Sequence, residues 1–171
     1  PEDLVAIDYY GQRLPRELPV HPRRPSSEWR LHADVLADRP DAMAVFHCHP
    51  IHATALACHD RGIPPFHYMT AVAGGDDIRC APYATFGTAE LSAHTVQALQ
   101  DRQACLLAHH GLVSLGRDLD QALKIAVEVE TLAQMYLQAL QLGEPPLLSA
   151  SQMEEVHRQF RGLGYGQASK D

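Results

Sequence analysis

The chain has 171 residues, 46% hydrophobic and 20% charged, which is the balance of a globular domain with a core of ordinary size. Its formal net charge is −7, from 14 Lys and Arg against 21 Asp and Glu, which argues against a nucleic-acid-binding protein because such proteins carry a basic surface. No apolar run approaches the roughly 20 residues of a membrane span and no signal peptide opens the chain, so we expect a cytoplasmic protein.

The first third of the chain predicts short strands followed by helices. Hydrophobic alternation, turn residues and prolines separate these elements. In chain order they are a strand and return strand at 4–7 and 12–14 around a turn at 8–11, an extended proline-rich loop at 15–25, a helix capped by Ser26 or Ser27 that runs to about residue 38, a strand at 43–49 and a helix from Pro50 to about residue 59.

The remainder continues this mixture, and Ser, Thr or Asp precedes each predicted helix as an N-terminal cap. We therefore predict one α/β domain of α+β layers over residues 1–171. The elements are strands at 66–72 and 78–83, a helix from Thr88 to about residue 102, strands at 104–108 and 112–115, the longest helix from Asp118 to the breakers at 143–146, and a last helix from Ser149 to about residue 161.

The strongest chemical signal is His47-Cys48-His49 in a predicted strand. Residues i and i+2 of a strand point to the same face, so the two imidazoles can converge on one metal ion while Cys48 faces the core. The alternative is a pair of partly buried structural histidines. The motif alone does not decide between them.

A second pair, His109-His110, precedes Gly111 at the end of a buried strand. By itself it is typical of a loop pair with no chemical role. Beside the first motif, one of these two histidines becomes a candidate third ligand. Three protein ligands leave an open position, which is typical of a catalytic rather than a structural zinc.

Ser26-Ser27-Glu28 stands at a predicted helix start. Simple capping explains it, because hydroxyls and a carboxylate stabilise the positive end of a helix. The same geometry also offers hydroxyls and free N–H groups to a phosphate, with a carboxylate beside them.

Other polar residues have simpler interpretations. The four cysteines show no C-x-x-C spacing and lie in apolar stretches, so we expect reduced thiols in the core. Glu128 and Glu130 on the long helix are expected to face solvent or a subunit contact. The remaining histidines are expected to be surface or core residues: His21, His32, His52, His59, His94 and His157.

Taken together, these motifs resemble the class II aldolase/adducin family, and most closely its L-fuculose-1-phosphate aldolase branch. The resemblance implies a central, mostly antiparallel sheet flanked by helices, and a homotetramer with active sites between subunits. The strings that carry it occur in order over nearly the whole chain: Pro25–Glu28, His47–His49, His67–Met69, Ala73–Gly75, Ala81–Thr88, Leu106–Gly111 and Glu128–Glu130.

The resemblance also implies a chemistry: a zinc-dependent aldehyde-lyase that reversibly cleaves a ketose 1-phosphate to dihydroxyacetone phosphate and an aldehyde through an enediolate. Its zinc ligands map to His47, His49 and His110, which leaves His109 as a neighbour. Glu28 maps to the proton-transfer group, which can also contact zinc when no substrate is bound.

Further roles follow from the same resemblance. Ser26 and Ser27 match hydroxyls that hold the substrate phosphate, and Tyr68 matches a proton donor or acceptor that reaches the neighbouring subunit's site. Tyr165 corresponds only loosely to a tyrosine that the family's tail places over the site. The family also carries phosphate loops in an N-terminal segment that would precede residue 1, and we expect this chain to lack them.

Other functions remain compatible with the residues. An L-ribulose-5-phosphate 4-epimerase shares the bond-breaking step but usually has Asp where this chain has Glu28. A methylthioribulose-phosphate dehydratase, or another aldolase with a different aldehyde partner, is also compatible, because substrate choice depends on a few pocket contacts. A non-catalytic adducin-like interaction domain would lose the metal ligands, which this chain keeps.

Overall fold

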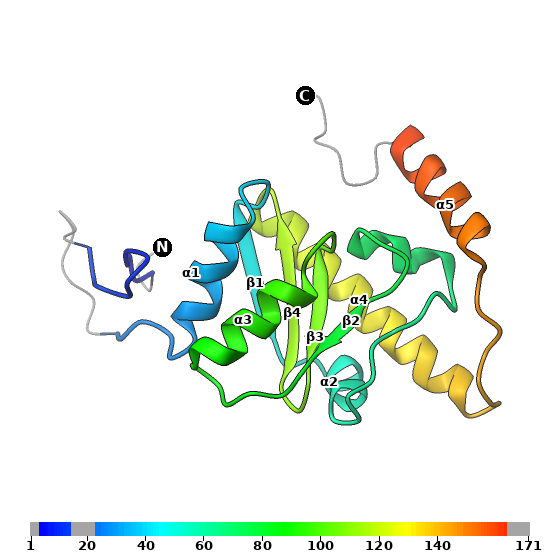
Figure 1. Ribbon diagram of the computed structural model, residues 1–171, viewed down its shortest axis with the longest axis horizontal. Helices are drawn as coiled ribbons and strands as arrows, with labels where there is room; N and C mark the ends of the chain where they lie inside the picture. Colours follow the sequence, from blue (N-terminus) through cyan, green and yellow to red (C-terminus); the bar gives the residue numbers. More distant parts are fainter. Residues whose placement is uncertain (1–3, 15–22, 164–171) are drawn as a thin grey trace.

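The computed structural model describes residues 4–14 and 23–163. Within them, a four-stranded sheet lies between two layers of helices (Figure 1). This arrangement confirms the expected α/β layers and the flanked sheet. The strands are β1 (Ala44–Cys48), β2 (Arg79–Ala81), β3 (Ala104–Leu107) and β4 (Gly111–Gly116), and their order across the sheet is β1-β4-β3-β2.

The sheet is mostly antiparallel, as expected. β4 pairs antiparallel with both β1 and β3, whereas the short edge strand β2 runs parallel to β3. β3 and β4 form a hairpin, and Cys48 at the end of β1 lies opposite Leu112 at the start of β4. The end of β1 therefore lies beside the turn of this hairpin.

Two hydrophobic cores cover the two faces of the sheet. α1 (Trp29–Asp38) and α3 (Ala89–Ala98) pack on one face, and α2 (Ile51–Ala57) and α4 (Leu119–Leu140) pack on the other (Figure 1). Strand alternation decides which side chain joins which core. In β3, Leu106 joins the α2 and α4 core, while Cys105 and Leu107 join the α1 and α3 core.

The strand predicted at residues 66–72 is wrong. Residues 66–72 are not a strand, because Tyr68–Ala73 forms a short 3-10 helix, η1. The His67 side chain accepts a hydrogen bond from the Met69 N–H, and Gly74 ends the helix at φ 89°. A local capping bond and a left-handed glycine therefore override the strand-like composition of this segment.

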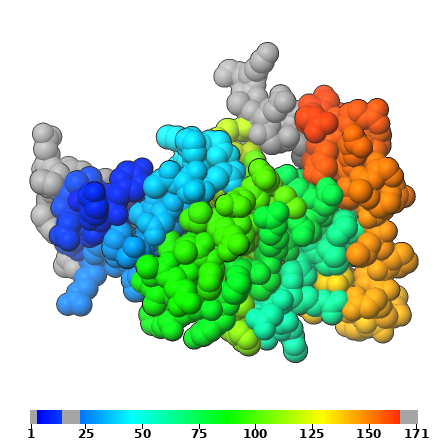
Figure 2. Space-filling model, viewed as in Figure 1, coloured from blue at the N-terminus to red at the C-terminus, as the bar shows by residue number. Residues whose placement is uncertain are grey.

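The helix caps predicted for the second half of the chain are confirmed. Thr88, Asp118 and Ser149 each accept a hydrogen bond from a backbone N–H in the first turn of α3, α4 and α5 (Ala150–Gly162). α5 lies at the far end of the molecule from residues 4–14 (Figure 2). The cap predicted for α1 is wrong: the helix starts after Glu28, no side chain makes a capping hydrogen bond there, and Ser26 and Ser27 belong to the turn that precedes it.

Shorter features follow the sequence in outline. Residues 4–14 form a hairpin in which Ile7 pairs with Arg13 and backbone hydrogen bonds join Asp8 to Gln12 and Leu14 to Ala6. Residues 15–22 of the expected loop lie outside the described part of the chain. All four cysteines carry free thiols, but Cys58 is exposed at the end of α2 and does not belong to the core. None of the helices in the described ranges is long and apolar enough to cross a membrane.

Candidate metal centre

His47 and His49 lie at the end of β1, on the face of the sheet that α1 covers. His47 has the same parity along the strand as Val45, which packs in the α1 and α3 core, whereas Cys48 packs against the opposite core. The Nε2 atoms of His47 and His49 lie 3.1 Å apart. Strand alternation therefore brings the two imidazoles together, as the H-x-H spacing predicted.

His110 comes from the turn of the β3–β4 hairpin. His109 has a left-handed backbone, with φ 54°, and this conformation turns the chain so that the two neighbouring histidines point in different directions. The His110 ring lies 4.8 Å from the His47 ring and 4.9 Å from the His49 ring, centroid to centroid. His109 is half exposed and lies 3.8 Å from a carboxylate oxygen of Asp60.

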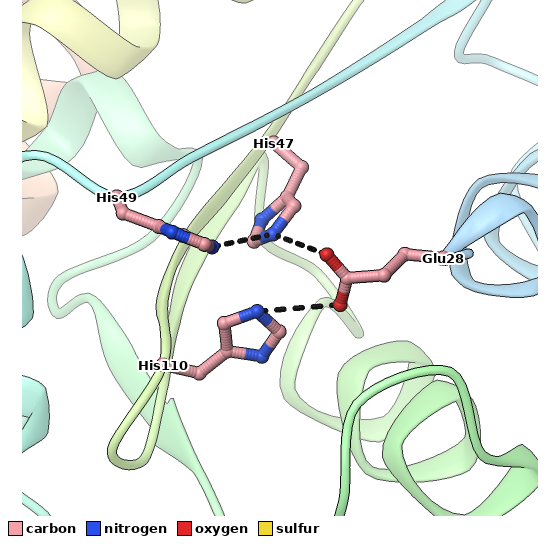
Figure 3. Close-up of side chains that lie close together, drawn as sticks. All are labelled: Glu28, His47, His49 and His110. Carbon is pink, nitrogen blue, oxygen red and sulfur yellow. Dashed lines mark hydrogen bonds and ion pairs between the residues drawn. The ribbon is translucent and has the colours of Figure 1, made fainter. Parts of the chain in front are cut away.

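Glu28 completes the cluster from the start of α1 (Figure 3). Its Oε2 lies 3.2 Å from Nε2 of His47, and its Oε1 lies 3.2 Å from Nε2 of His110. Ser26 accepts a hydrogen bond from the Glu28 N–H at 3.1 Å and so shapes the turn that presents the carboxylate. Ser27 is adjacent, and its carbonyl oxygen packs against Gly87, where a Cβ would come within 2.9 Å.

The four side chains could hold a metal ion, since their candidate ligand atoms all lie within 4.8 Å of one another. Two atoms that bind one tetrahedral zinc at about 2.0–2.1 Å lie about 3.3 Å apart, and the neighbouring donors here are separated by 3.1 and 3.2 Å. This spacing fits a single small cation at the centre of the cluster.

Proton positions at His47 support the same conclusion. Its Nδ1 lies 2.9 Å from the carbonyl oxygen of Leu112, so the neutral ring carries its proton there and donates it. Nε2 of His47 then has a lone pair and no proton, and it faces the Glu28 carboxylate, which is also a hydrogen-bond acceptor. Oε1 of Glu28 is buried and has no well-formed hydrogen bond within the described residues. Acceptors that face one another in this way require a cation or a proton between them.

Burial keeps part of this site neutral. The pKa of His110 is lowered chiefly by burial and also by His47 and His49, although the Glu28 charge opposes the shift. His32 lies one helical turn beyond Glu28, with its ring 6.5 Å from that of His47, and its pKa is also lowered, by burial and by His47. A neutral imidazole is the form that binds a metal. The i, i+4 spacing from Glu28 would have placed His32 near the site from sequence alone.

A second group of polar residues, between α2 and α4, was not anticipated. Glu130 was expected to face solvent or another subunit, but it is part-buried and accepts hydrogen bonds from the N–H groups of His52 and Ala53. The His52 ring also lies 2.7 Å from its carboxylate. No sequence motif joins these residues, because they meet only when α2 packs on α4.

Tyr68 is not brought to the cluster within one chain. It lies in η1, half exposed, with its ring packed on His67 and 6.5 Å from the Phe160 ring of α5. Tyr165, the other tyrosine considered, lies outside the described residues.

The model of the Class II Aldolase and Adducin N-terminal domain matches residues 1–137. The chain belongs to the class II aldolase and adducin family. This membership confirms the family inferred from the motifs, and its enzymes with aldolase activity are lyases.

Aldolases of this family from bacteria are similar to nearly the whole chain. A 5-methylthioribulose-1-phosphate/5-deoxyribulose-1-phosphate aldolase of Rhodospirillum rubrum is 54% identical over 164 residues, which cover 96% of this chain and 72% of the relative. The L-fuculose phosphate aldolase of Escherichia coli is 51% identical over 162 residues, covering 94% and 73%. A solved L-fuculose 1-phosphate aldolase superposes with a TM-score of 0.85 at 40% identity, over 94% of this chain and 73% of that one.

Proposed function

We propose that this chain is a zinc-dependent aldolase that cleaves a ketose 1-phosphate to dihydroxyacetone phosphate and an aldehyde. The observation that carries the proposal is the convergence of His47, His49, His110 and Glu28 on one point, in a chain of the class II aldolase family. Three neutral imidazoles leave the full charge of the ion in place and leave room for substrate oxygens. When bound, the ion would supply a Lewis acid that stabilises the negative charge developing on the ketose oxygens.

Glu28 is the proton-transfer group in this proposal. Breaking the carbon–carbon bond next to the ketone leaves its electron pair on the dihydroxyacetone phosphate half, as an enediolate. Glu28 delivers a proton to the enediolate carbon at which the bond was broken, and this completes dihydroxyacetone phosphate. Its position supports this role, because the carboxylate reaches the centre of the cluster and only 14% of the side chain is exposed.

Ser26 and Ser27 are proposed to hold the substrate phosphate. They lie in the turn directly before α1, and Ser26 already orients the N–H of Glu28. Hydroxyls and unpaired N–H groups at a helix start favour an anion. This placement would put the phosphate close to the proton-transfer group without requiring a basic cluster, which is consistent with the negative net charge of the chain.

Tyr68 is proposed to act in the site of a neighbouring subunit, where it would remove the hydroxyl proton of the substrate during cleavage. Its half-exposed ring lies apart from the metal cluster of its own chain. Three exposed apolar residues of α4, Leu119, Leu123 and Val127, recur every four residues along one face of the helix. Such a face supports assembly, and we propose a homotetramer with shared active sites.

The relatives differ in the substrates for which they are named, and these substrates differ in the aldehyde half. The Rhodospirillum rubrum relative acts, by its name, on 5-methylthioribulose 1-phosphate and 5-deoxyribulose 1-phosphate, and the Escherichia coli relative acts on L-fuculose phosphate. Both names describe aldolases, which favours an aldolase over the dehydratase considered from the sequence. A 5-deoxypentulose 1-phosphate is therefore the second candidate substrate beside L-fuculose 1-phosphate.

The test is release of dihydroxyacetone phosphate by the zinc-loaded protein. L-fuculose 1-phosphate, 5-deoxyribulose 1-phosphate and 5-methylthioribulose 1-phosphate would be compared by kcat/KM, with the chelator-treated protein as control. Zinc-dependent release from any of them supports the proposed reaction, and the ratios identify the preferred aldehyde.

Two other results would redirect the assignment. Interconversion of L-ribulose 5-phosphate and its 4-epimer without release would favour the epimerase. A protein that binds no zinc and releases nothing would favour a non-catalytic interaction domain.

A further inference from the structure

The helix α2 contacts both chain segments that carry the metal-site histidines. It begins at Ile51, two residues after His49, with only Pro50 between them. At its other end, the carbonyl oxygen of Ala57 accepts a hydrogen bond from the His109 N–H at 3.0 Å, next to His110. In Figure 1 this short helix lies beside the turn of the β3–β4 hairpin. Any displacement of α2 would therefore reach both segments.

The start of α2 lacks the usual means of holding itself in place. Its N-terminal cap is Pro50, which makes no side-chain capping bond, and no acidic residue stands in its first turn. The first N–H groups of a helix need acceptors from outside the helix. Glu130 of α4 supplies them, because its Oε1 accepts from the His52 N–H at 3.0 Å and its Oε2 from the Ala53 N–H at 2.9 Å.

His49 depends on this anchoring more than His47 does. His47 lies within β1, paired with Val113, and its ring donates to the Leu112 carbonyl. His49 follows the last residue of the strand and is exposed. Within the described residues, its ring has only one hydrogen-bond contact, with His47. Its backbone direction is therefore set by the strand end on one side and by α2 on the other.

We propose that Glu130 is a positioning residue for the metal site, since its carboxylate fixes α2 and through it the segments that carry His49 and His110. Both carboxylate oxygens are used on backbone N–H groups, so the anchor resists rotation as well as translation. Because α4 also packs on β1 and β4, the contact with Glu130 fixes the position of α2 relative to the sheet that carries His47. The inference rests on the proposed metal site.

The test compares metal binding by Glu130→Ala and Glu130→Gln with that of the unchanged protein. Zn²⁺ affinity would be measured by chelator competition, and Co²⁺ would be used as a probe whose visible absorption reports ligand geometry. Loss of a residue that orients a metal ligand typically weakens binding by about 10- to 100-fold. We expect that loss, with an altered Co²⁺ spectrum, for Glu130→Ala. Glu130→Gln keeps one acceptor oxygen and should lose less.

Two control variants separate positioning from a general loss of stability. Tyr136→Phe, also on α4, removes the buried hydroxyl that accepts from Arg61 and should lower Tm without changing metal affinity. Glu154→Ala removes an exposed carboxylate of α5 and should change neither. If Glu130→Ala does not fold, Glu130→Gln carries the comparison alone.

The outcomes are distinct. Unchanged affinity and an unchanged Co²⁺ spectrum in the Glu130 variants would overturn this inference and leave the proposed function standing. Equal losses of affinity in Tyr136→Phe would also overturn it, because the effect would then follow stability. Failure of the unchanged protein to bind either metal would overturn the metal site itself, and the inference with it.

Discussion

Gly111 lies against the ring of His49 so closely that a side chain has no room. A Cβ on Gly111 would come within 2.7 Å of Cδ2 of His49 and within 2.5 Å of the carbonyl oxygen of Cys48. The first residue of β4 thus forms the surface on which one proposed metal ligand rests. Glycine is required here by this close approach.

Gly111→Ala is therefore expected to displace the His49 ring. Overpacking of this kind costs about 1–3 kcal/mol of stability, and displacement of a ligand should weaken Zn²⁺ binding by about tenfold or more. Isothermal titration and thermal unfolding would measure both effects. Gly162→Ala is the control, because a Cβ there meets nothing within 4 Å. Unchanged zinc affinity in Gly111→Ala would contradict the role assigned to this contact.

Glu28→Gln tests proton transfer separately from metal binding. The amide keeps the size of the side chain but cannot transfer a proton, so kcat should fall by about 10²–10⁴. Zinc content should remain close to that of the unchanged protein, because the three histidines are retained. Steady-state rates together with metal analysis would show this. A variant with near-normal turnover would remove Glu28 from the proposed role.

His109 and His110 should differ sharply although they are neighbours. His110→Ala removes a side chain of the cluster and is expected to abolish tight zinc binding, whereas His109→Ala should retain it. The reason is the left-handed backbone at His109, which directs its ring toward Tyr83 and away from the cluster. Zinc retained after dialysis of each variant is the measurement. Equal loss of zinc in both variants would show that metal binding depends on the conformation of the hairpin turn and not on the His110 ring alone.

Acid should destabilise the metal-free protein through two part-buried histidines, His110 and His32. The pKa values of His110 and His32 are lowered in the folded state, mainly by burial, so the unfolded chain takes up protons first as the pH falls through about 6.5. The free energy of unfolding should therefore decrease from about pH 7.5 to about pH 5.5, by at most about 1.4 kcal/mol per pH unit for each histidine.

Urea unfolding in the presence of a chelator would measure this dependence. His32→Gln should flatten it, since one of the two groups no longer titrates. Greater stability at the acid end would mean that charged histidines gain more from Glu28 and other carboxylates than burial costs them.

Tyr68 offers a test of shared active sites. Tyr68→Phe should lower kcat by about 10²–10⁴, because no group then takes the hydroxyl proton. If Tyr68 serves a neighbouring chain, mixing the inactive Tyr68→Phe and Glu28→Gln proteins under conditions that exchange subunits should restore activity. In a mixed assembly, some sites combine an intact Glu28 with an intact Tyr68. Each variant exchanged with itself is the control, and no recovery in the mixture would place Tyr68 outside the neighbouring site.

Much of this protein could be read from short stretches of sequence. The side-by-side placement of His47 and His49 follows from strand alternation, and the caps at Thr88, Asp118 and Ser149 follow from side chains that bond the adjacent turn. These features depend on residues only a few positions apart, so local geometry is sufficient. Composition predicted the wrong element at residues 66–72. There, the capping hydrogen bond that the His67 side chain accepts from the Met69 N–H outweighed a strand-like composition.

Only the tertiary structure decided which distant residues meet. The placement of Glu28 between His47 and His110 requires α1, β1 and the β3–β4 hairpin to pack together. From spacing alone, His109 and His110 were equal candidates, and one backbone angle separates them. Glu130 lies in one of the matching strings, but nothing in the sequence indicated its contact with α2, because that contact is defined by helix packing and by unpaired backbone N–H groups. Sequence patterns encode periodicity and caps, whereas contacts between distant segments depend on how the layers pack.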